Sequence, residues 1–76
     1  MSASNKSPVG KTGRVSRHGA IRPGRLGEVL IPIRGGVEAF LARDADGGAI
    51  APYAAVVVVD YQPPRLVLVT PLTEES

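Results

Sequence analysis

A Gly-Gly pair at Gly35-Gly36, with strand-forming runs on both sides, is the feature that most constrains the fold. Glycine adopts positive φ without steric cost, so a two-residue glycine loop between β-branched runs predicts a β-hairpin. The predicted arms are residues 27–34 and 37–43. A two-residue loop also sets the register, which here predicts four cross-strand pairs: Arg34 with Val37, Ile31 with Phe40, Val29 with Ala42, and Glu28 with Arg43.

Both faces of this predicted hairpin are mostly apolar. Because successive side chains of a strand alternate, one face carries Val29, Ile31, Ile33, Phe40 and Ala42, with Glu38 near the turn. An ordinary half-exposed hairpin would carry polar residues on its second face. If the first face is core, the second is a candidate protein interface, formed by Leu30, Pro32, Arg34, Val37, Ala39 and Leu41.

The remaining strands and turns predict a small all-β protein. Residues 9–17, 55–61 and 66–69 read as strands, with the last one ended by Pro71, and residues 44–48 read as an acidic, glycine-rich turn. No stretch has helical spacing of apolar residues. Five short strands predict a closed barrel of the OB or SH3-like kind over residues 9–72, with disordered tails at 1–8 and 73–76. Closure would protect the aggregation-prone run Val56–Val59 from lying at a sheet edge.

Composition excludes most catalytic and metal-dependent classes. The chain has no cysteine and one histidine, so a zinc site built from Cys and His is excluded. Asp44 and Asp46 are too few ligands for calcium and suit turn chemistry better. His18 has no arranged nucleophile or orienting acid, although Ser16 is near in sequence. We therefore expect no enzyme activity, no cofactor and no metal.

The sequence predicts a soluble, cytoplasmic chain that does not itself insert into a membrane. Its longest apolar stretch, residues 49–59, is too short to span a bilayer and contains Pro52. No signal peptide is visible at the N-terminus. Whether the chain is a fragment of a larger protein is left open.

Charge is distributed unevenly along the sequence. Residues 1–43 carry eight Lys or Arg and two Glu, whereas residues 44–76 carry one Arg and five acids. Such asymmetry is typical either of a nucleic-acid or anionic-membrane footprint or of two solvated halves that attract each other. For a single-stranded nucleic-acid binder of the OB type, the candidate contacts are Arg14, Arg17, Arg22, Arg25, Tyr53 and Tyr61.

Five segments, in order, resemble the C-terminal soluble domain of the NfeD-like proteins. They are Val9–Val15, Ile21–Gly24 leading into Gly27–Val29, Gly36–Ala42, Ile50 with Val56–Val59, and Leu66–Val69. Together they span nearly the whole predicted barrel. The sequence departs from the family in the connector Ala51-Pro52-Tyr53, where the family usually has a glycine.

The resemblance implies a five-stranded OB-fold barrel. It also implies a parent protein with transmembrane helices, tethering this domain beside stomatin- or flotillin-type scaffold proteins. Some longer members carry a serine protease domain, and nothing in this sequence matches it. The resulting hypothesis is a non-catalytic protein-interaction module. A single-stranded nucleic-acid binder is the alternative, and a domain that acts only as a homo-oligomer cannot be separated from the first hypothesis by sequence.

Overall fold

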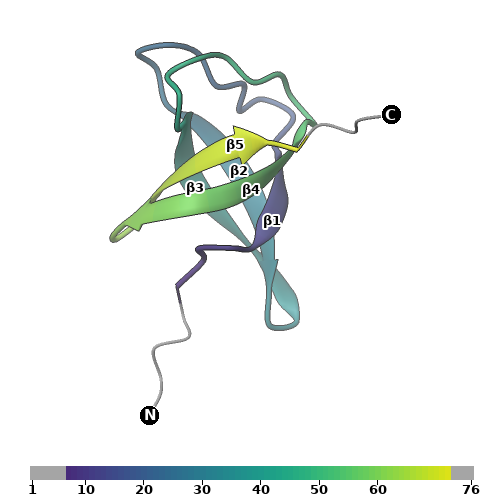
Figure 1. Cartoon of the computed structure of the whole chain (residues 1–76). Coiled ribbons are helices and arrows are strands. Elements are labelled where there is room, and N and C mark those ends of the chain that lie inside the picture. The colour runs from purple at the N-terminus through teal and green to yellow at the C-terminus, as the bar shows by residue number, and fades with distance from the viewer. Residues whose placement is uncertain (1–6, 73–76) are drawn as a thin grey trace.

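The computed structural model describes residues 7–72, which form five strands joined by loops and turns. The strands are β1 (Thr12–Val15), β2 (Gly27–Ile33), β3 (Gly36–Asp44), β4 (Ala55–Gln62) and β5 (Leu66–Pro71). These strands close into a barrel in the order β1-β2-β3-β5-β4 (Figure 1). The β3–β5 pair is parallel and the others are antiparallel. The predicted all-β barrel is confirmed, and its strand order is the Greek key of an OB-fold.

Closure protects the valine run as the sequence predicts. Strand β4 pairs with β1 on one side and with β5 on the other, so Val56–Val59 does not lie at a sheet edge. A β-bulge interrupts the β4–β5 register between Val58 and Asp60. Val59 and Asp60 are both exposed there, so the alternation of buried and exposed residues along β4 breaks at the bulge. A bulge of this kind typically bends the strand that carries it and increases its twist.

The core is formed by the inward-pointing residues of all five strands and by two loop residues. In β2 buried and exposed residues alternate strictly from Gly27 to Pro32, which is the pattern of a sheet with one face on the core. Two loop residues, Ile21 and Ile50, bond to each other through their backbones and close one end of the barrel. The buried apolar residues are Val15, Ile21, Val29, Ile31, Phe40, Ala42, Ile50, Val56, Val58, Val67 and Val69.

The β2–β3 turn lies one residue earlier than the sequence predicts. Its two loop residues are Arg34 and Gly35, with φ of 49° and 82°, and the closing pair is Ile33 with Gly36. Two successive positive φ values are the requirement of a type I′ hairpin turn. Arg34 therefore adopts the positive φ that the prediction assigned to a glycine.

This earlier turn shifts the register by two residues. Phe40 is opposite Val29, and Glu28 is opposite Leu41. The four predicted pairs are therefore wrong: Arg34 with Val37, Ile31 with Phe40, Val29 with Ala42, and Glu28 with Arg43. A shift of two residues, unlike a shift of one, keeps every side chain on its predicted face. The assignment of Val29, Ile31, Phe40 and Ala42 to the core is confirmed.

Gly13 allows β1 to cross close to β2. A Cβ at this position would overlap the Leu30 carbonyl oxygen and lie 2.9 Å from Ile31 Cγ1. Only glycine permits this approach without moving the backbone of β2. Strand β1 pairs with β2 only at Arg14–Leu30 and Val15–Val29, while its first residues pair with β4.

The strand boundaries differ from the prediction at both ends of the chain. β1 begins at Thr12 rather than at residue 9, and β5 extends through Pro71 instead of ending before it. Pro8, which the sequence analysis assigns to the N-terminal tail, has a fully buried side chain. Residues 1–6 and 73–76 of the predicted tails lie outside the described residues.

Candidate interaction surface

The outer face of the β2–β3 hairpin presents apolar side chains to the surface. Leu30, Val37 and Leu41 are 38%, 62% and 48% exposed, Pro32 is exposed, and Ala39 is half-buried. Cross-strand pairs bring Pro32 beside Val37 and Leu30 beside Ala39. These residues are on the surface, as the alternation predicts, and their role in binding stays a prediction.

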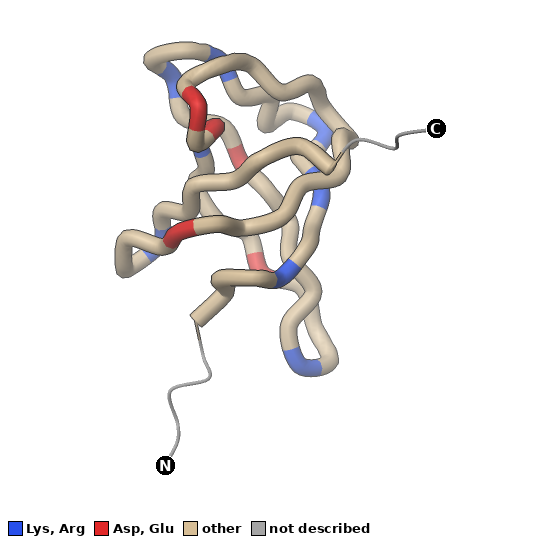
Figure 2. The backbone as a smooth tube through the Cα atoms, viewed as in Figure 1, with Lys and Arg blue, Asp and Glu red and all other residues tan. Residues whose placement is uncertain are grey.

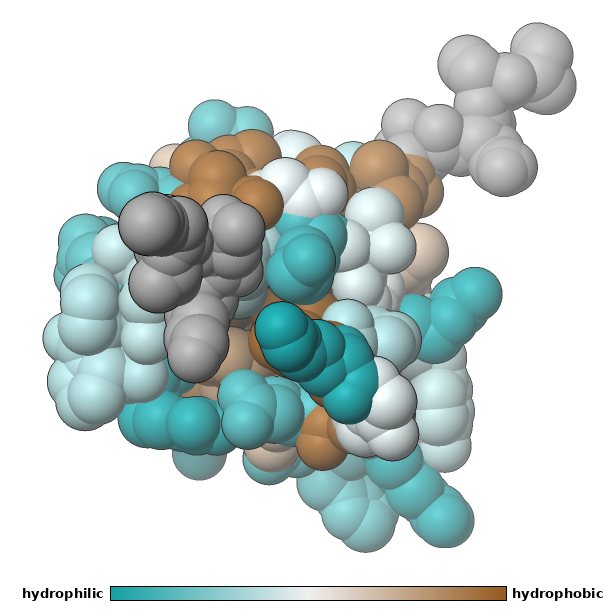
Figure 3. Space-filling view, turned by 90° about the horizontal axis from the view of Figure 1, so that it is seen from below, coloured by the Kyte–Doolittle hydropathy of each residue, from teal (hydrophilic) through white to brown (hydrophobic). Residues whose placement is uncertain are grey.

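A shallow depression extends this apolar face across β1 to the end of β5. It is lined by Thr12, Gly13, Arg14, Leu30, Pro32, Val37, Ala55 and Leu72. Pro32 has no backbone N–H to offer a neighbouring strand, and the β1–β2 pairing ends two residues before it, at Leu30. Viewed from the hairpin-tip side, Figure 3 shows hydrophobic residues reaching the surface between hydrophilic ones.

Sequence reasoning missed the contribution of Ala55 and Leu72 to this depression. Both are distant in sequence from the hairpin, and they meet because the Leu72 N–H donates to the Ala55 carbonyl oxygen at 2.9 Å. No local pattern signals this meeting, since the β4–β5 pairing joins Ala55 to Leu72 and the β4–β1 pairing brings both to the depression.

The candidate nucleic-acid contacts do not form one groove with both tyrosines. Arg14 lies beside Tyr53, because its Nη1 donates to the Tyr53 carbonyl oxygen at 3.0 Å, and the Tyr53 side chain is 60% exposed. Tyr61 is half-buried, packs edge-on against Phe40 and donates its hydroxyl to the Pro64 carbonyl oxygen. Tyr61 is thus engaged in the fold, and only Tyr53 presents an exposed ring for stacking.

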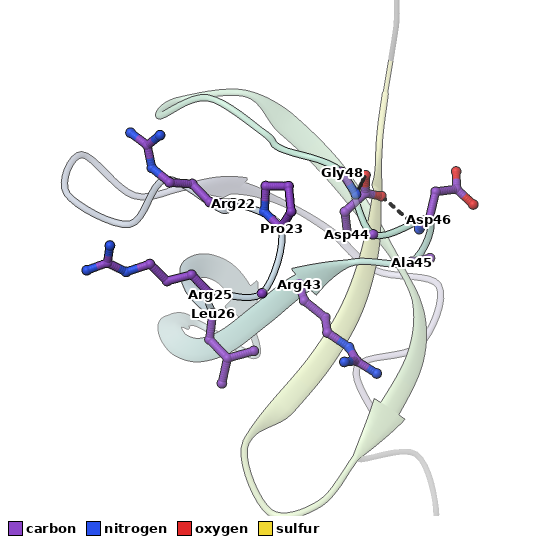
Figure 4. Close-up of a pocket in the computed structure, with 11 residues that line it drawn as sticks. Arg22, Pro23, Arg25, Leu26, Arg43, Asp44, Ala45, Asp46 and Gly48 are labelled. Carbon is purple, nitrogen blue, oxygen red and sulfur yellow. Dashed lines mark hydrogen bonds between the residues drawn. The ribbon is translucent and has the colours of Figure 1, made fainter.

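Arg22 and Arg25 lie together in the β1–β2 loop, while Arg17 is exposed earlier in the same loop. Figure 4 shows both side chains at one edge of a depression that also contains Arg43 and the residues 44–48 turn. A second depression, on the other side of the loop, includes His18, Glu28 and Leu41. Residues 22, 25 and 26 line both depressions, so this segment stands between them.

Asp44 organises its own turn. Its carboxylate oxygens accept the N–H groups of Asp46 at 3.2 Å and Gly48 at 3.0 Å, as Figure 4 shows. This is the turn chemistry that the sequence predicts for the acidic segment.

Ser16 is buried with an unpaired hydroxyl, and the His18 side chain is exposed in the loop.

Basic residues are distributed over both ends of the barrel rather than along one stripe (Figure 2). Within residues 7–72, no group of three or more His, Asp or Glu side chains could hold a metal ion. Over the same residues, no helix is long and apolar enough to cross a membrane.

The fold is a closed five-stranded barrel of OB topology with an exposed apolar hairpin face. The family described as NfeD C-terminal domain matches residues 12–70, and the chain belongs to this family. The family resemblance seen in the sequence is thereby confirmed. No curated protein matches the sequence.

Two solved structures are similar to this chain. One is the soluble domain of the NfeD protein YuaF from Bacillus subtilis, with 32% identity, a TM-score of 0.69, and coverage of 82% of this chain and 70% of that one. The other is the C-terminal domain of stomatin operon partner protein 1510-C from Pyrococcus horikoshii, with 23% identity and a TM-score of 0.72. That alignment covers 96% of this chain and all of the other, and it shows a shared fold.

Proposed function

We propose that this chain is a non-catalytic protein-interaction module that binds through the outer face of the β2–β3 hairpin. The observation that carries the proposal is the row of exposed apolar residues Leu30, Pro32, Val37 and Leu41. Soluble monomers seldom expose a contiguous apolar patch without a binding role. Charged residues lie near the patch, including Glu28, Arg34 and Arg43, and an apolar centre with a polar rim is typical of protein interfaces.

The proposed partner is a stomatin- or flotillin-type scaffold protein or a second copy of this chain. Support for a scaffold comes from the family and from the name of the archaeal relative, a stomatin operon partner protein. In this proposal the barrel is the cytoplasmic soluble end of a membrane-associated protein.

The test replaces Leu30 and Leu41 with threonine in one variant. Threonine keeps β-propensity while removing apolar surface, so we expect an unchanged fold and loss of self-association or of scaffold capture. Sedimentation and pull-down measure binding, and thermal unfolding measures the fold. The control variant is Val9→Thr/Val59→Thr, because these valines have similar exposure and lie outside the face. Unfolding of the first variant would mean that the face is core, and unchanged binding would overturn the proposal.

The alternative function, single-stranded nucleic-acid binding, has one exposed tyrosine and scattered arginines in its favour. We expect weak affinity for oligonucleotides that falls steeply with salt, because the contribution of charge is present while the stacking platform is incomplete. Fluorescence anisotropy over a salt series measures this. Tight binding at physiological salt that is lost in Tyr53→Ala would favour the alternative.

A further inference from the structure

The β1–β2 loop contains a tight turn that sets two arginines opposite each other. The Arg25 N–H donates to the Arg22 carbonyl oxygen at 2.9 Å, and the Arg22 N–H donates back to Arg25 at 3.3 Å. Pro23 and Gly24 occupy the corners, and the φ of 75° at Gly24 is that of a type II turn. Because directly opposed residues of an antiparallel bridge point to the same side, the two guanidinium groups extend together, as Figure 4 shows.

Two like charges in this position repel each other, and arginine does not lose its charge. The carboxylate of Asp44, in one depression, is engaged by two N–H groups of its own turn, and Glu28 lines the depression on the other side of the arginine pair. In Figure 4 the side chains of Asp44 and Asp46 lie on the other side of the depression from the arginine pair. An anion between the guanidinium groups would relieve the repulsion, and phosphate oxygens match the fork of N–H donors that each arginine presents.

The shape of the segment indicates where that phosphate is carried. Residues 22, 25 and 26 line depressions on both sides, so the segment forms a ridge rather than the floor of a pocket. Small ligands are usually held in concave sites. Leu26, at the end of the ridge, is 46% exposed. Arginines beside an exposed leucine suit a membrane interface, where the apolar side chain enters the acyl boundary and the cations remain among the headgroups.

We propose that the Arg22–Leu26 ridge binds lipid phosphate groups and docks the barrel on an anionic membrane surface. This site is separate from the outer face of the hairpin, and it does not depend on the proposed protein partner. Each arginine near an anionic surface contributes modestly, so binding by this ridge is weak and falls with salt.

The test measures co-sedimentation of the full chain with vesicles of phosphatidylcholine, with and without phosphatidylglycerol. We expect binding only when phosphatidylglycerol is present. Arg22→Gln/Arg25→Gln should reduce that binding by about tenfold or more. The charge-matched control is Lys11→Gln/Arg34→Gln, which removes two cations near the opposite ends of β1 and β2 and should have a much smaller effect. Thermal unfolding confirms that each variant folds.

The contribution of Leu26 is tested separately. Leu26→Ser should weaken vesicle binding, whereas Val59→Ser, at a residue that is also 46% exposed, should not. The proposal is overturned if phosphatidylglycerol vesicles do not bind, or if both double variants lose binding equally, since net charge would then explain the effect.

Two further measurements separate lipid from other anions. Backbone amide shifts on titration with inorganic phosphate, confined to the ridge and without vesicle binding, would assign a free-phosphate site and contradict the membrane role. Binding of polyglutamate through Arg22 and Arg25, again without vesicle binding, would assign the ridge to an acidic protein partner and also contradict it.

Discussion

The two faces of the β2–β3 hairpin have similar composition and opposite environments. On the inner face, Val29, Ile31 and Ala42 are fully buried, whereas Leu30 and Leu41 on the outer face are 38% and 48% exposed. Both sets are apolar, so composition does not distinguish them. Closure of the barrel places one set in the core and leaves the other in water. The apolar character of the outer face is therefore not required by the core, and a binding role gives it a physical explanation.

The largest contrast between the faces is expected from adjacent residues, Phe40 and Leu41. The Phe40 ring is 5% exposed, packs against the Tyr61 ring with centroids 6.3 Å apart, and lies 4.8 Å from the Arg65 guanidinium carbon. Phe40→Ala should lower the free energy of unfolding by about 3–5 kcal/mol, enough to unfold much of a domain this small. Leu41→Ala should change it by about 0.5 kcal/mol.

Urea denaturation of both variants measures this contrast. Equal losses would show that the outer face contributes to the core as much as the inner face does. If Phe40→Ala loses little stability, whatever the result for Leu41→Ala, the assignment of Phe40 to the barrel interior is contradicted.

An intermediate effect is expected at Gly13, where β1 passes close to the backbone of β2. Gly13→Ala places a Cβ against the Leu30 carbonyl oxygen, so it should destabilise the fold by about 1–3 kcal/mol through overpacking. The matched control is Gly36→Ala near the hairpin tip, where a Cβ would have no contact closer than 4.0 Å. That control should change stability by less than about 1 kcal/mol. Similar melting temperatures for the two variants would mean that β1 can move away from β2 at little cost.

The smallest effect is expected at Tyr53, on the outside of the barrel. Its φ of 70° lies in the left-handed region that favours glycine, and its ring is 60% exposed. Tyr53→Gly should relieve strain of about 1–2 kcal/mol and add about 0.5–1 kcal/mol of unfolded-state entropy. The net change in the free energy of unfolding should be a gain of about 0–1.5 kcal/mol. A clear loss on thermal unfolding would show that the ring supports the fold.

The backbone at Tyr53 shows how the fold accommodates the connector in which the sequence departs from the family pattern. The connector Ala51-Pro52-Tyr53 lacks the glycine that the resemblance implies, yet Tyr53 adopts a positive φ of the kind that favours glycine. Two contacts hold the Tyr53 backbone in place. The Tyr53 N–H donates to the Val15 carbonyl oxygen at 2.8 Å, and the Arg14 side chain donates to the Tyr53 carbonyl oxygen at 3.0 Å. Neither contact depends on the tyrosine side chain, so the surrounding structure imposes the turn on this residue.

The alternation of side chains along each strand allowed the two faces of the hairpin to be predicted. It did not determine which two residues form the turn. Arg34-Gly35 and Gly35-Gly36 loops give registers that differ by two residues, and both keep Val29 and Phe40 on one face. The hydrophobic pattern therefore has no preference between them. The arginine pair at Arg22 and Arg25 was predicted only as two separate basic residues, because their opposition depends on the backbone of the Pro23-Gly24 turn.

The sequence by itself determined the number of strands, the class of fold and the side of the β2–β3 hairpin that is buried. These properties follow from side-chain alternation and turn residues, which act over a few neighbouring positions. Tertiary structure alone decided the β2–β3 register, the parallel pairing of β3 with β5, and the meeting of Leu72 and Ala55 with the hairpin. These contacts join residues distant in sequence, and local preferences leave several pairings nearly equal in energy until the barrel closes and selects one.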